Sequence, residues 1–266
     1  MVKAKAKAKA KTKAKAKAKA KAKAKAKAKI TLFKATSING ETCNNTAWGI
    51  GKTRKMRAKM QPVPRACTED FFYAFDDLVD AIIKCDDYGF RIPCIIWEAE
   101  TPKIYIDDGD KVCVRELTTV KPLLYLNNTP TPELRKVLIT LILKIISRSS
   151  ALMRACEDKR RDTYKKLRIA FWTGDLKKVK KSLVAFRVAK IPSWSTQCYA
   201  PTSIYNIKNT VAKLSQKDID INDLKSLVDD FREYVLFEFD RTAINEWLLN
   251  QLRKSKTLGK AYEEPE

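Results

Sequence analysis

Five carboxylates lie close together in the first half of the sequence and have the clearest potential for metal chemistry. Asp107, Asp108 and Asp110 sit within four residues, and Glu98 and Glu100 precede them in a strand-like run. Nucleases that depend on divalent metal ions use such carboxylates, and they need no histidine. A metal-dependent nuclease is therefore one hypothesis, although the turn chemistry of a hairpin tip explains the aspartates more simply.

The absence of histidine narrows the remaining enzyme classes sharply. It excludes Ser-His-Asp and Cys-His nucleophile systems, HExxH metalloproteases and histidine-containing zinc sites. The seven cysteines are odd in number, widely spaced and never in a CxxC pair, which favours reduced thiols inside a cell over a zinc module. We therefore expect a protein that is not an enzyme and that has no metal and no cofactor.

Two further motifs are incomplete. Gly49–Thr53 ends like a phosphate-binding P-loop, but Thr46 stands where that motif requires glycine. Residues 218–222 open like a calcium loop, but Asp223 replaces the glycine and Asp229 the glutamate that the loop requires. Neither motif predicts a ligand site.

The strongest signal is an N-terminal repeat in which lysine and alanine alternate over residues 1–29 with no acidic residue. A helix would place these lysines in like-charge i,i+4 pairs, each costing about 0.2–0.5 kcal/mol, so we expect the tail to be disordered when unbound. A polycation of this kind predicts a polyanionic partner, with nucleic acid favoured over an acidic protein, a localisation signal or a solubilising role. Its 14 lysines are Lys3, Lys5, Lys7, Lys9, Lys11, Lys13, Lys15, Lys17, Lys19, Lys21, Lys23, Lys25, Lys27 and Lys29.

The composition of this tail resembles the lysine- and alanine-rich tails of linker histones and of bacterial proteins similar to histone H1. The resemblance covers only residues 1–29 and extends to no part of the body. It implies sequence-independent condensation of nucleic acid.

The net charge of +23 is unevenly distributed. Residues 1–29 carry +14, 30–67 carry +6, 68–128 carry −7, 131–190 carry +12 and 191–266 carry −2. The body therefore has basic regions of its own, and we expect the tail to extend a basic surface. Behind the tail lies a second basic tract, which consists of Lys52, Arg54, Lys55, Arg57 and Lys59. We expect this tract and the tail to bind one polyanion together.

Two predicted helices form the strongest signal in the body, because basic residues recur on both between positions 158 and 190. We expect their basic faces to contact nucleic acid, and the alternative is packing against an acidic partner or the acidic region 68–128. The candidate residues are Arg160, Arg161, Lys165, Lys166, Arg168, Lys177, Lys178, Lys180 and Lys181.

The acidic region is expected to begin with a helix over 69–88 with Thr68 as its N-cap. Strands are predicted at 90–97, 103–106 and 111–117, because these runs are rich in β-branched and aromatic residues. Asp107–Asp110 is a hairpin signal, for which we favour a three-residue loop with Gly109 in the left-handed conformation.

Helices account for the rest of the predicted body. Thr131 is expected to cap a long helix over 132–172 with a bend near 147–150, and Asp175 is expected to cap the next helix. Further helices are predicted at 203–214 and 222–254, the second broken near Asp240.

The predicted fold class is α+β but predominantly α, with a helical body and one small antiparallel β-hairpin sheet after a disordered basic tail. The expected organisation is a tail over 1–29, a basic arm or linker over 30–67, a single body over 68–254 and a flexible C-terminus over 255–266. Within the body we expect the sheet at 90–117, the basic helices at 132–190 and the C-terminal helices at 203–254. This list follows the shifts in composition along the chain.

No secretory signal and no membrane span are predicted, because the N-terminus has no apolar core and the most apolar run covers only Val137–Ile146. We expect an intracellular protein of the nucleus or of a virion. The leading hypothesis is a non-enzymatic structural protein that binds and condenses nucleic acid, with DNA favoured. The alternative is a capsid or core component of a large DNA virus or another assembly, whose basic arm contacts the genome or acidic neighbours. Acidic protein partners or self-assembly are further possible partners.

Overall fold

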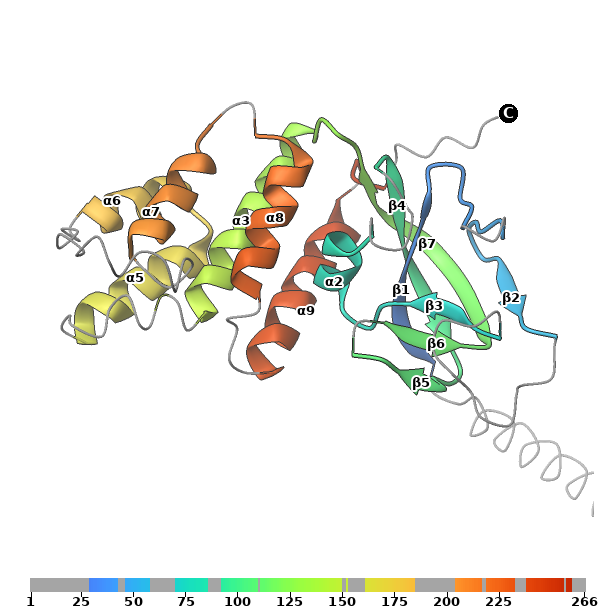
Figure 1. Cartoon of the computed structure of the whole chain (residues 1–266). Helices are drawn as coiled ribbons and strands as arrows, with labels where there is room; N and C mark the ends of the chain where they lie inside the picture. Colours follow the sequence, from blue (N-terminus) through green and yellow to red (C-terminus); the bar gives the residue numbers. More distant parts are fainter. Residues whose placement is uncertain are drawn as a thin grey trace, which may run out of the picture.

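The computed structural model of the chain combines a β part with a helical part that extends from it (Figure 1). The structure describes residues 29–42, 46–57, 70–85, 92–109, 111–149, 152, 161–184, 204–216, 219–232, 238–255 and 257–259. Among the elements of the described residues, all strands and helix α2 lie between residues 30 and 126, and the other helices lie between residues 132 and 254. The broad expectation of an α+β protein is thus confirmed.

The larger sheet has four antiparallel strands in the order β1-β4-β7-β2. Its strands are β1 (Ile30–Ser37), β2 (Thr53–Lys55), β4 (Cys94–Thr101) and β7 (Glu116–Leu126). Pro122 lies within the central strand β7, where proline removes a donor from the ladder. The β4–β7 register shifts on either side of the Trp97–Pro122 pair, so irregular pairing accommodates that proline.

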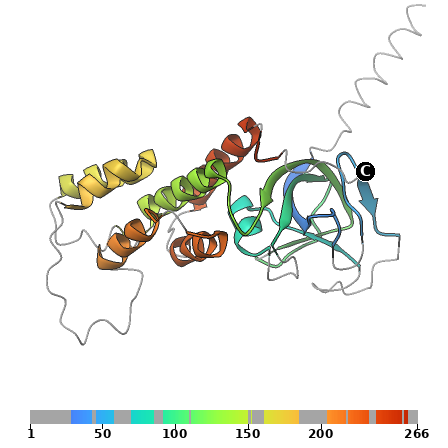
Figure 2. The same ribbon diagram turned by 90° about the horizontal axis from the view of Figure 1, so that it is seen from above.

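A smaller sheet of three antiparallel strands lies beside the first, in the order β3-β6-β5. These strands are β3 (Phe72–Ala74), β5 (Ile106–Asp107) and β6 (Val112–Val114). Phe33 of β1 and Phe75 exchange two backbone hydrogen bonds of 2.7 and 2.8 Å, which join the two sheets. Figure 2 shows the strands of this β part curling around one another. A small core of the β part contains Leu32, Trp48, Ala74, Ala99, Val112, Val114 and Leu117.

The β part corrects three expectations from the sequence. The sequence analysis expected one hairpin sheet, but the described strands form two sheets. The expectation of a predominantly α fold therefore overstates the helical share. Residues 30–67 do not form an arm or linker alone, because β1 and β2 belong to the larger sheet. The expected helix over 69–88 is replaced by β3 and by the short helix α2 (Leu78–Ile83), which Asp77 caps. Thr68 lies outside the described residues.

The predicted hairpin is present, but its register is different. Gly109 has a φ of 76°, the left-handed conformation that was expected. Ile106 pairs with Cys113 and Asp107 pairs with Val112, so four residues, 108–111, lie between the paired positions instead of the expected three.

The helical part is built around α3 (Pro132–Arg148), which begins at the predicted cap Thr131. The expected continuous helix to 172 ends at Arg148, because Ser149 has an extended ψ of 146°. The remaining helices are α5 (Arg161–Thr173), α6 (Leu176–Val184), α7 (Ile204–Lys213), α8 (Ile221–Arg232) and α9 (Glu238–Lys254). Asp240, where a break was predicted, lies inside α9, and residues 233–237 between α8 and α9 are outside the described residues.

The main core lies where the outer face of the larger sheet meets the helices. Phe33 and Ile96 from that sheet pack in one cluster with Leu138 of α3 and Leu248 of α9. The start of the expected flexible C-terminus is also packed, since Leu258 is buried and its carbonyl accepts a 3.1 Å hydrogen bond from the Tyr125 N–H. No helix within the described ranges is both long and apolar enough to span a membrane.

Candidate nucleic-acid interface

The carboxylates that suggested a nuclease are engaged in separate contacts. Glu98 is 8% exposed, accepts two hydrogen bonds from the Arg253 guanidinium and lies 3.7 Å from the Lys121 ammonium. The bond to Glu98 raises the pKa of Arg253. Asp107 accepts a 2.9 Å hydrogen bond from the Gly109 N–H, which is turn chemistry. Asp110 is outside the described residues, and within them no group of three potential ligands could hold a metal ion.

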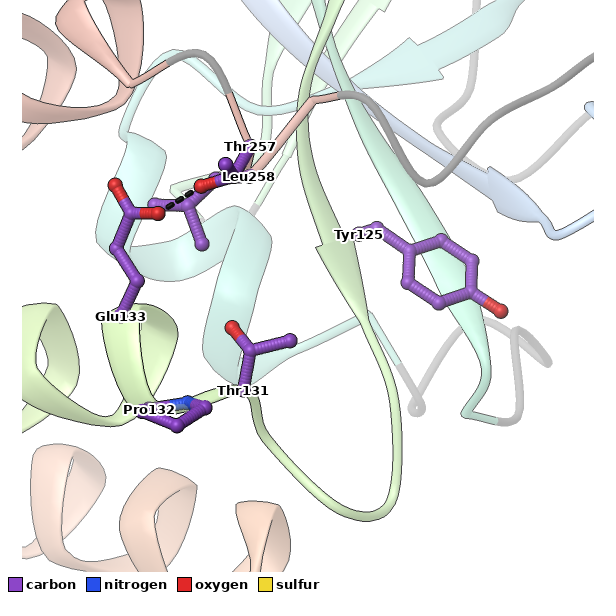
Figure 3. A pocket seen from close by; sticks show the side chains of 6 residues that line it. All are labelled: Tyr125, Thr131, Pro132, Glu133, Thr257 and Leu258. Carbon is purple, nitrogen blue, oxygen red and sulfur yellow. Dashed lines mark hydrogen bonds between the residues drawn. The ribbon is translucent and has the colours of Figure 1, made fainter.

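A cavity of about 340 Å³ lies where β7 leads into α3 (Figure 3). Its only acidic group, Glu133, accepts hydrogen bonds from the hydroxyls of Ser255 and Thr257. The lining residues are Tyr125, Thr131, Pro132, Glu133, Thr257 and Leu258. The Glu133 carboxylate in this cavity is therefore already bonded within the chain.

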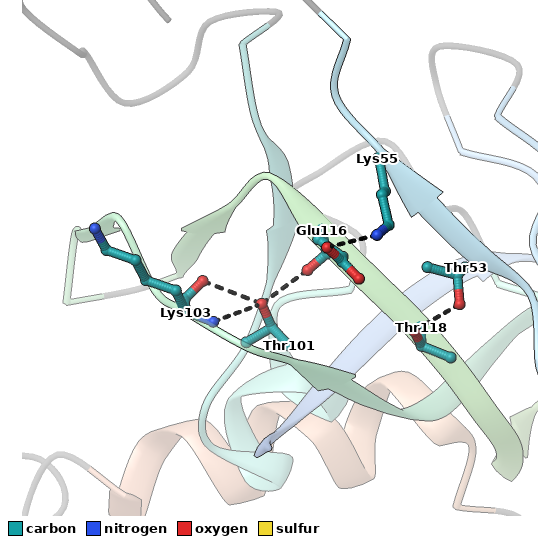
Figure 4. A network of polar contacts seen from close by, with 6 residues as sticks. All are labelled: Thr53, Lys55, Thr101, Lys103, Glu116 and Thr118. Atoms are coloured by element: carbon teal, nitrogen blue, oxygen red, sulfur yellow. Dashed lines mark hydrogen bonds and ion pairs between the residues drawn. The ribbon is translucent and has the colours of Figure 1, made fainter. Parts of the chain in front are cut away.

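The last lysine of the tail lies at the same end of the larger sheet as the second basic tract, with strands β4 and β7 between them. Ile30 pairs with Thr101, whose hydroxyl donates a 2.7 Å hydrogen bond to the Glu116 carbonyl. Glu116 in turn pairs with Lys55, and their side chains form a 3.1 Å ion pair (Figure 4). We call the exposed basic residues at this end the root surface: Lys29, Lys55, Arg57 and Lys103.

Not every residue of the second tract is available to a partner. The Arg54 guanidinium donates two hydrogen bonds, of 3.1 and 2.7 Å, to the Ala47 carbonyl and so holds the preceding loop. Lys52 and Arg57 are exposed, whereas Lys55 shares its charge with Glu116. Lys59 lies outside the described residues, as do the tail lysines up to Lys27. No pattern in the sequence indicates that Arg54 is structural, because the group that accepts its hydrogen bonds is a backbone carbonyl.

Helices α5 and α6 pack against each other and expose basic side chains. Leu167 and Phe171 of α5 and Val179 and Leu183 of α6 are buried, so the lysines between them point outward. We call this exposed set the helical basic face; it contains Lys165, Lys166, Lys177, Lys178, Lys180 and Lys181, with the half-buried Arg168 at its margin. Arg160 lies outside the described residues, and of Arg161 only the backbone is described.

Among the side chains that the structure describes, the helical basic face meets little acidic charge. Asp175 lies 3.8 Å from the Lys178 ammonium, and its carboxylate also accepts the N–H groups of Lys177 and Lys178 at 3.0 and 3.1 Å. Asp175 is therefore the N-cap of α6, as predicted. Most of the positive charge on this face remains available to an external anion.

Two contacts with α3 fix the position of the α5–α6 pair. Gly174, in the turn between these helices, has a φ of 70°, and a Cβ there would lie 2.4 Å from Thr140 Cγ2. Lys144 of α3 donates a 2.7 Å hydrogen bond to the Trp172 carbonyl in the last turn of α5. Because α5 has no basic residue in that turn, Lys144 supplies the cation that the helix C-terminus favours.

Lys144 occupies an aromatic site whose chemistry can be tested by pH. Its ammonium lies 4.0 and 4.9 Å from the ring centroids of Trp172 and Trp247, and it is 7% exposed. Burial, with a smaller effect of Arg148, lowers the pKa of Lys144 below its ordinary value of 10.5. The folded protein therefore loses this proton at a lower pH than the unfolded chain does.

We expect the natural protein to gain stability relative to Lys144→Met as the pH rises toward 10.5. In that window the unfolded chain binds more protons at this position than the folded protein, so the free energy of unfolding rises with pH. Urea unfolding of both proteins at a series of pH values from about pH 8 upward measures how the difference between their free energies of unfolding changes with pH. A difference that is constant with pH would contradict this account of Lys144.

The two basic surfaces lie at opposite ends of the molecule (Figures 1 and 2). α5 packs on α3 and α6, and α6 packs on α7, whereas the root surface belongs to the sheets. This arrangement corrects the expectation that the tail extends one continuous basic surface. It also rules out, for the described residues, that the acidic region 68–128 covers the basic helices.

An acidic stripe on α8, which the sequence analysis missed, lies between the two ends. It contains Asp220, Asp223, Asp229 and Asp230, all of which are exposed. Burial, and then repulsion from Asp229, raises the pKa of Asp230, while Lys213 lies 3.7 Å from Asp223. The helical spacing of the last three aspartates, at i, i+6 and i+7, was the available signal.

Comparisons of the chain with models of known protein families, with curated proteins and with solved structures found no significant match.

Proposed function

We propose that the protein is a non-enzymatic, sequence-independent nucleic-acid-binding protein that neutralises phosphates with its lysine tail and its basic surfaces. The observation that carries the proposal is the tail itself, with 14 lysines and no acidic residue in its 29 positions. Double-stranded DNA carries one negative charge per about 1.7 Å of its axis, so each lysine of an extended tail meets a phosphate within its reach.

The root surface supports the same proposal. Lys29 is exposed and forms a 2.6 Å ion pair with Glu100, so the tail starts at a fixed point on the body. Arg57 and Lys103 are exposed at this end of the sheet, beside the Lys55–Glu116 pair. A nucleic acid that binds the tail lysines next to β1 therefore also meets the cations of the root surface on the body.

The binding free energy in this proposal comes from the release of counterions. Ten bound lysines would give a slope of about −9 in a plot of log affinity against log salt concentration. The sequence has no helix-turn-helix, RNA-recognition or zinc-finger signature that would read bases, so the proposed partner is the backbone, with DNA favoured.

The test is a salt titration of the natural protein on duplexes of unrelated sequence and on single-stranded and double-stranded RNA. We expect a slope of about −6 or steeper on duplex DNA and affinities within about threefold across the duplex sequences. A shallow slope, or strong preference for one sequence, would contradict the proposal. The RNA arms identify the preferred nucleic acid, since only RNA offers 2′-hydroxyls to the protein.

A further inference from the structure

We propose that one molecule of this protein bridges two separate nucleic-acid segments, holding one through the tail and root surface and the other on the helical basic face. This inference rests on the proposed function, and it adds a second binding surface and its geometry. The inference predicts that the protein captures a second nucleic-acid segment. A protein with the same lysine tail on an uncharged body would not do so.

The helical basic face matches a duplex in size and charge. The 13 residues of α5 span about 20 Å, and a duplex presents about 12 phosphates over that length. Six exposed lysines and the half-buried Arg168 face outward on α5 and α6, and among the described side chains Asp175 forms an ion pair with one of them, Lys178. The face can therefore neutralise about half of the phosphates along it.

This second surface is held in place before any ligand binds. The turn between α5 and α6 packs on Thr140 through Gly174, and Lys144 holds the end of α5. Arg148 also lies over the Trp172 ring, 4.4 Å from its centroid, while it forms a 2.9 Å ion pair with Asp240. A positioned surface loses less conformational freedom on binding than mobile side chains do.

The space between the two surfaces disfavours one continuous binding path. α3, α8 and α9 lie between the sheets and the α5–α6 pair (Figure 1). The acidic stripe of α8 faces solvent there and repels phosphate. A duplex that extended across α8 from either surface would meet this stripe, so contacts to one surface leave the other available for a second segment.

The experiment captures a labelled duplex with protein that is already bound to an immobilised duplex. The test variant is the full chain with Gln at Lys165, Lys166, Lys177, Lys178, Lys180 and Lys181. The matched control carries Gln at six tail positions instead, Lys3, Lys5, Lys7, Lys9, Lys11 and Lys13, so both variants have a net charge of +17. A third variant with Arg at the six helical positions preserves the charge of the face.

We expect the natural protein, the tail control and the Arg variant to capture the second duplex at 150 mM salt. The helical Gln variant should bind the immobilised duplex but capture at least about tenfold less of the second one, since six phosphate contacts are lost. Equal capture by the helical Gln variant, or loss of capture in the Arg variant, would overturn the inference.

The two proposals fail in different ways. If the natural protein binds a single duplex and captures no second one, the bridging inference is wrong and the proposed function stands. If the natural protein binds neither duplex, the proposed function itself is wrong. Thermal unfolding of all four proteins shows whether each variant remains folded. If the helical Gln variant is destabilised, a double variant with Lys177→Gln and Lys181→Gln replaces it. We expect this double variant to lose less of its capture of the second duplex.

Discussion

Removal of residues 1–28 is expected to lower the affinity for duplex DNA by at least about a hundredfold at 50 mM salt. The truncation removes 13 lysines and takes the net charge from +23 to +10. It also makes the salt dependence shallower, because each lost phosphate contact removes about 0.9 from the slope. Salt-titrated binding of the two proteins to the same duplex measures both effects.

The truncation is placed before Lys29 for a structural reason. The Lys29 ammonium pairs with Glu100 at 2.6 Å at the start of β1, so its removal would change the sheet as well as the tail. A full-length control with Gln at the 13 removed lysines keeps the chain length and loses the charge. We expect this control to behave like the truncated protein. Unchanged affinity in both would place the binding on the body alone and contradict the role of the tail.

Gly174→Ala is expected to destabilise the protein strongly through the turn between α5 and α6. The residue has a φ of 70°, and the left-handed conformation costs a residue with a Cβ about 1–2 kcal/mol. The new Cβ would also lie 2.4 Å from Thr140 Cγ2, and overpacking adds about 1–3 kcal/mol. Urea unfolding should therefore show a loss of about 2–5 kcal/mol.

Two further variants separate the two causes. Gly109 has a φ of 76° and no neighbour within 4 Å of an added Cβ, so Gly109→Ala should cost only the backbone part. Thr140→Ala combined with Gly174→Ala removes the clashing methyl and should recover most of the packing part. If the double variant is as unstable as Gly174→Ala, the contact with Thr140 is not what positions this turn.

Features that depend on neighbouring residues in the sequence were predictable. Thr131 and Asp175 were recognised as caps because an N-cap bonds to N–H groups only two or three residues away. Gly109 was recognised for the same reason, since a tight hairpin needs a residue with positive φ. The exposure of the lysines on α6 followed from the spacing of Val179 and Leu183.

The β1 strand was missed because its burial depends on distant partners. Lys34 and Thr36 are buried on the inner face of β1 and made the segment look mixed in polarity. Lys34 donates a 2.6 Å hydrogen bond to the Tyr73 carbonyl, and Thr36 accepts one of 2.8 Å from the Trp97 indole. These partners lie 39 and 61 residues away, so no local pattern could reveal them.

In the candidate site too, features that depend on neighbouring residues were predictable and features that depend on distant residues were not. The sequence placed the basic residues on α5 and α6 correctly, because a helix face can be deduced from its period. It could not show that Glu98 is held by Arg253, 155 residues later, or that the two basic surfaces lie at opposite ends. Both of these depend on how strands and helices far apart in the chain are brought together.

The pairing of β1 with β4 also determines how the body withstands tension. Ile30 pairs with Thr101 and Ser37 with Cys94, so the strand next to the tail is bonded to its neighbour along all eight of its residues. A pull on the tail acts along β1 and loads this ladder in shear, with the bonds sharing the force rather than breaking one by one. From β4 the force passes to β7 and then, through only five residues, to α3, which carries the α5–α6 pair. A load applied between the two ends of the body would therefore pass through paired strands and one short connection.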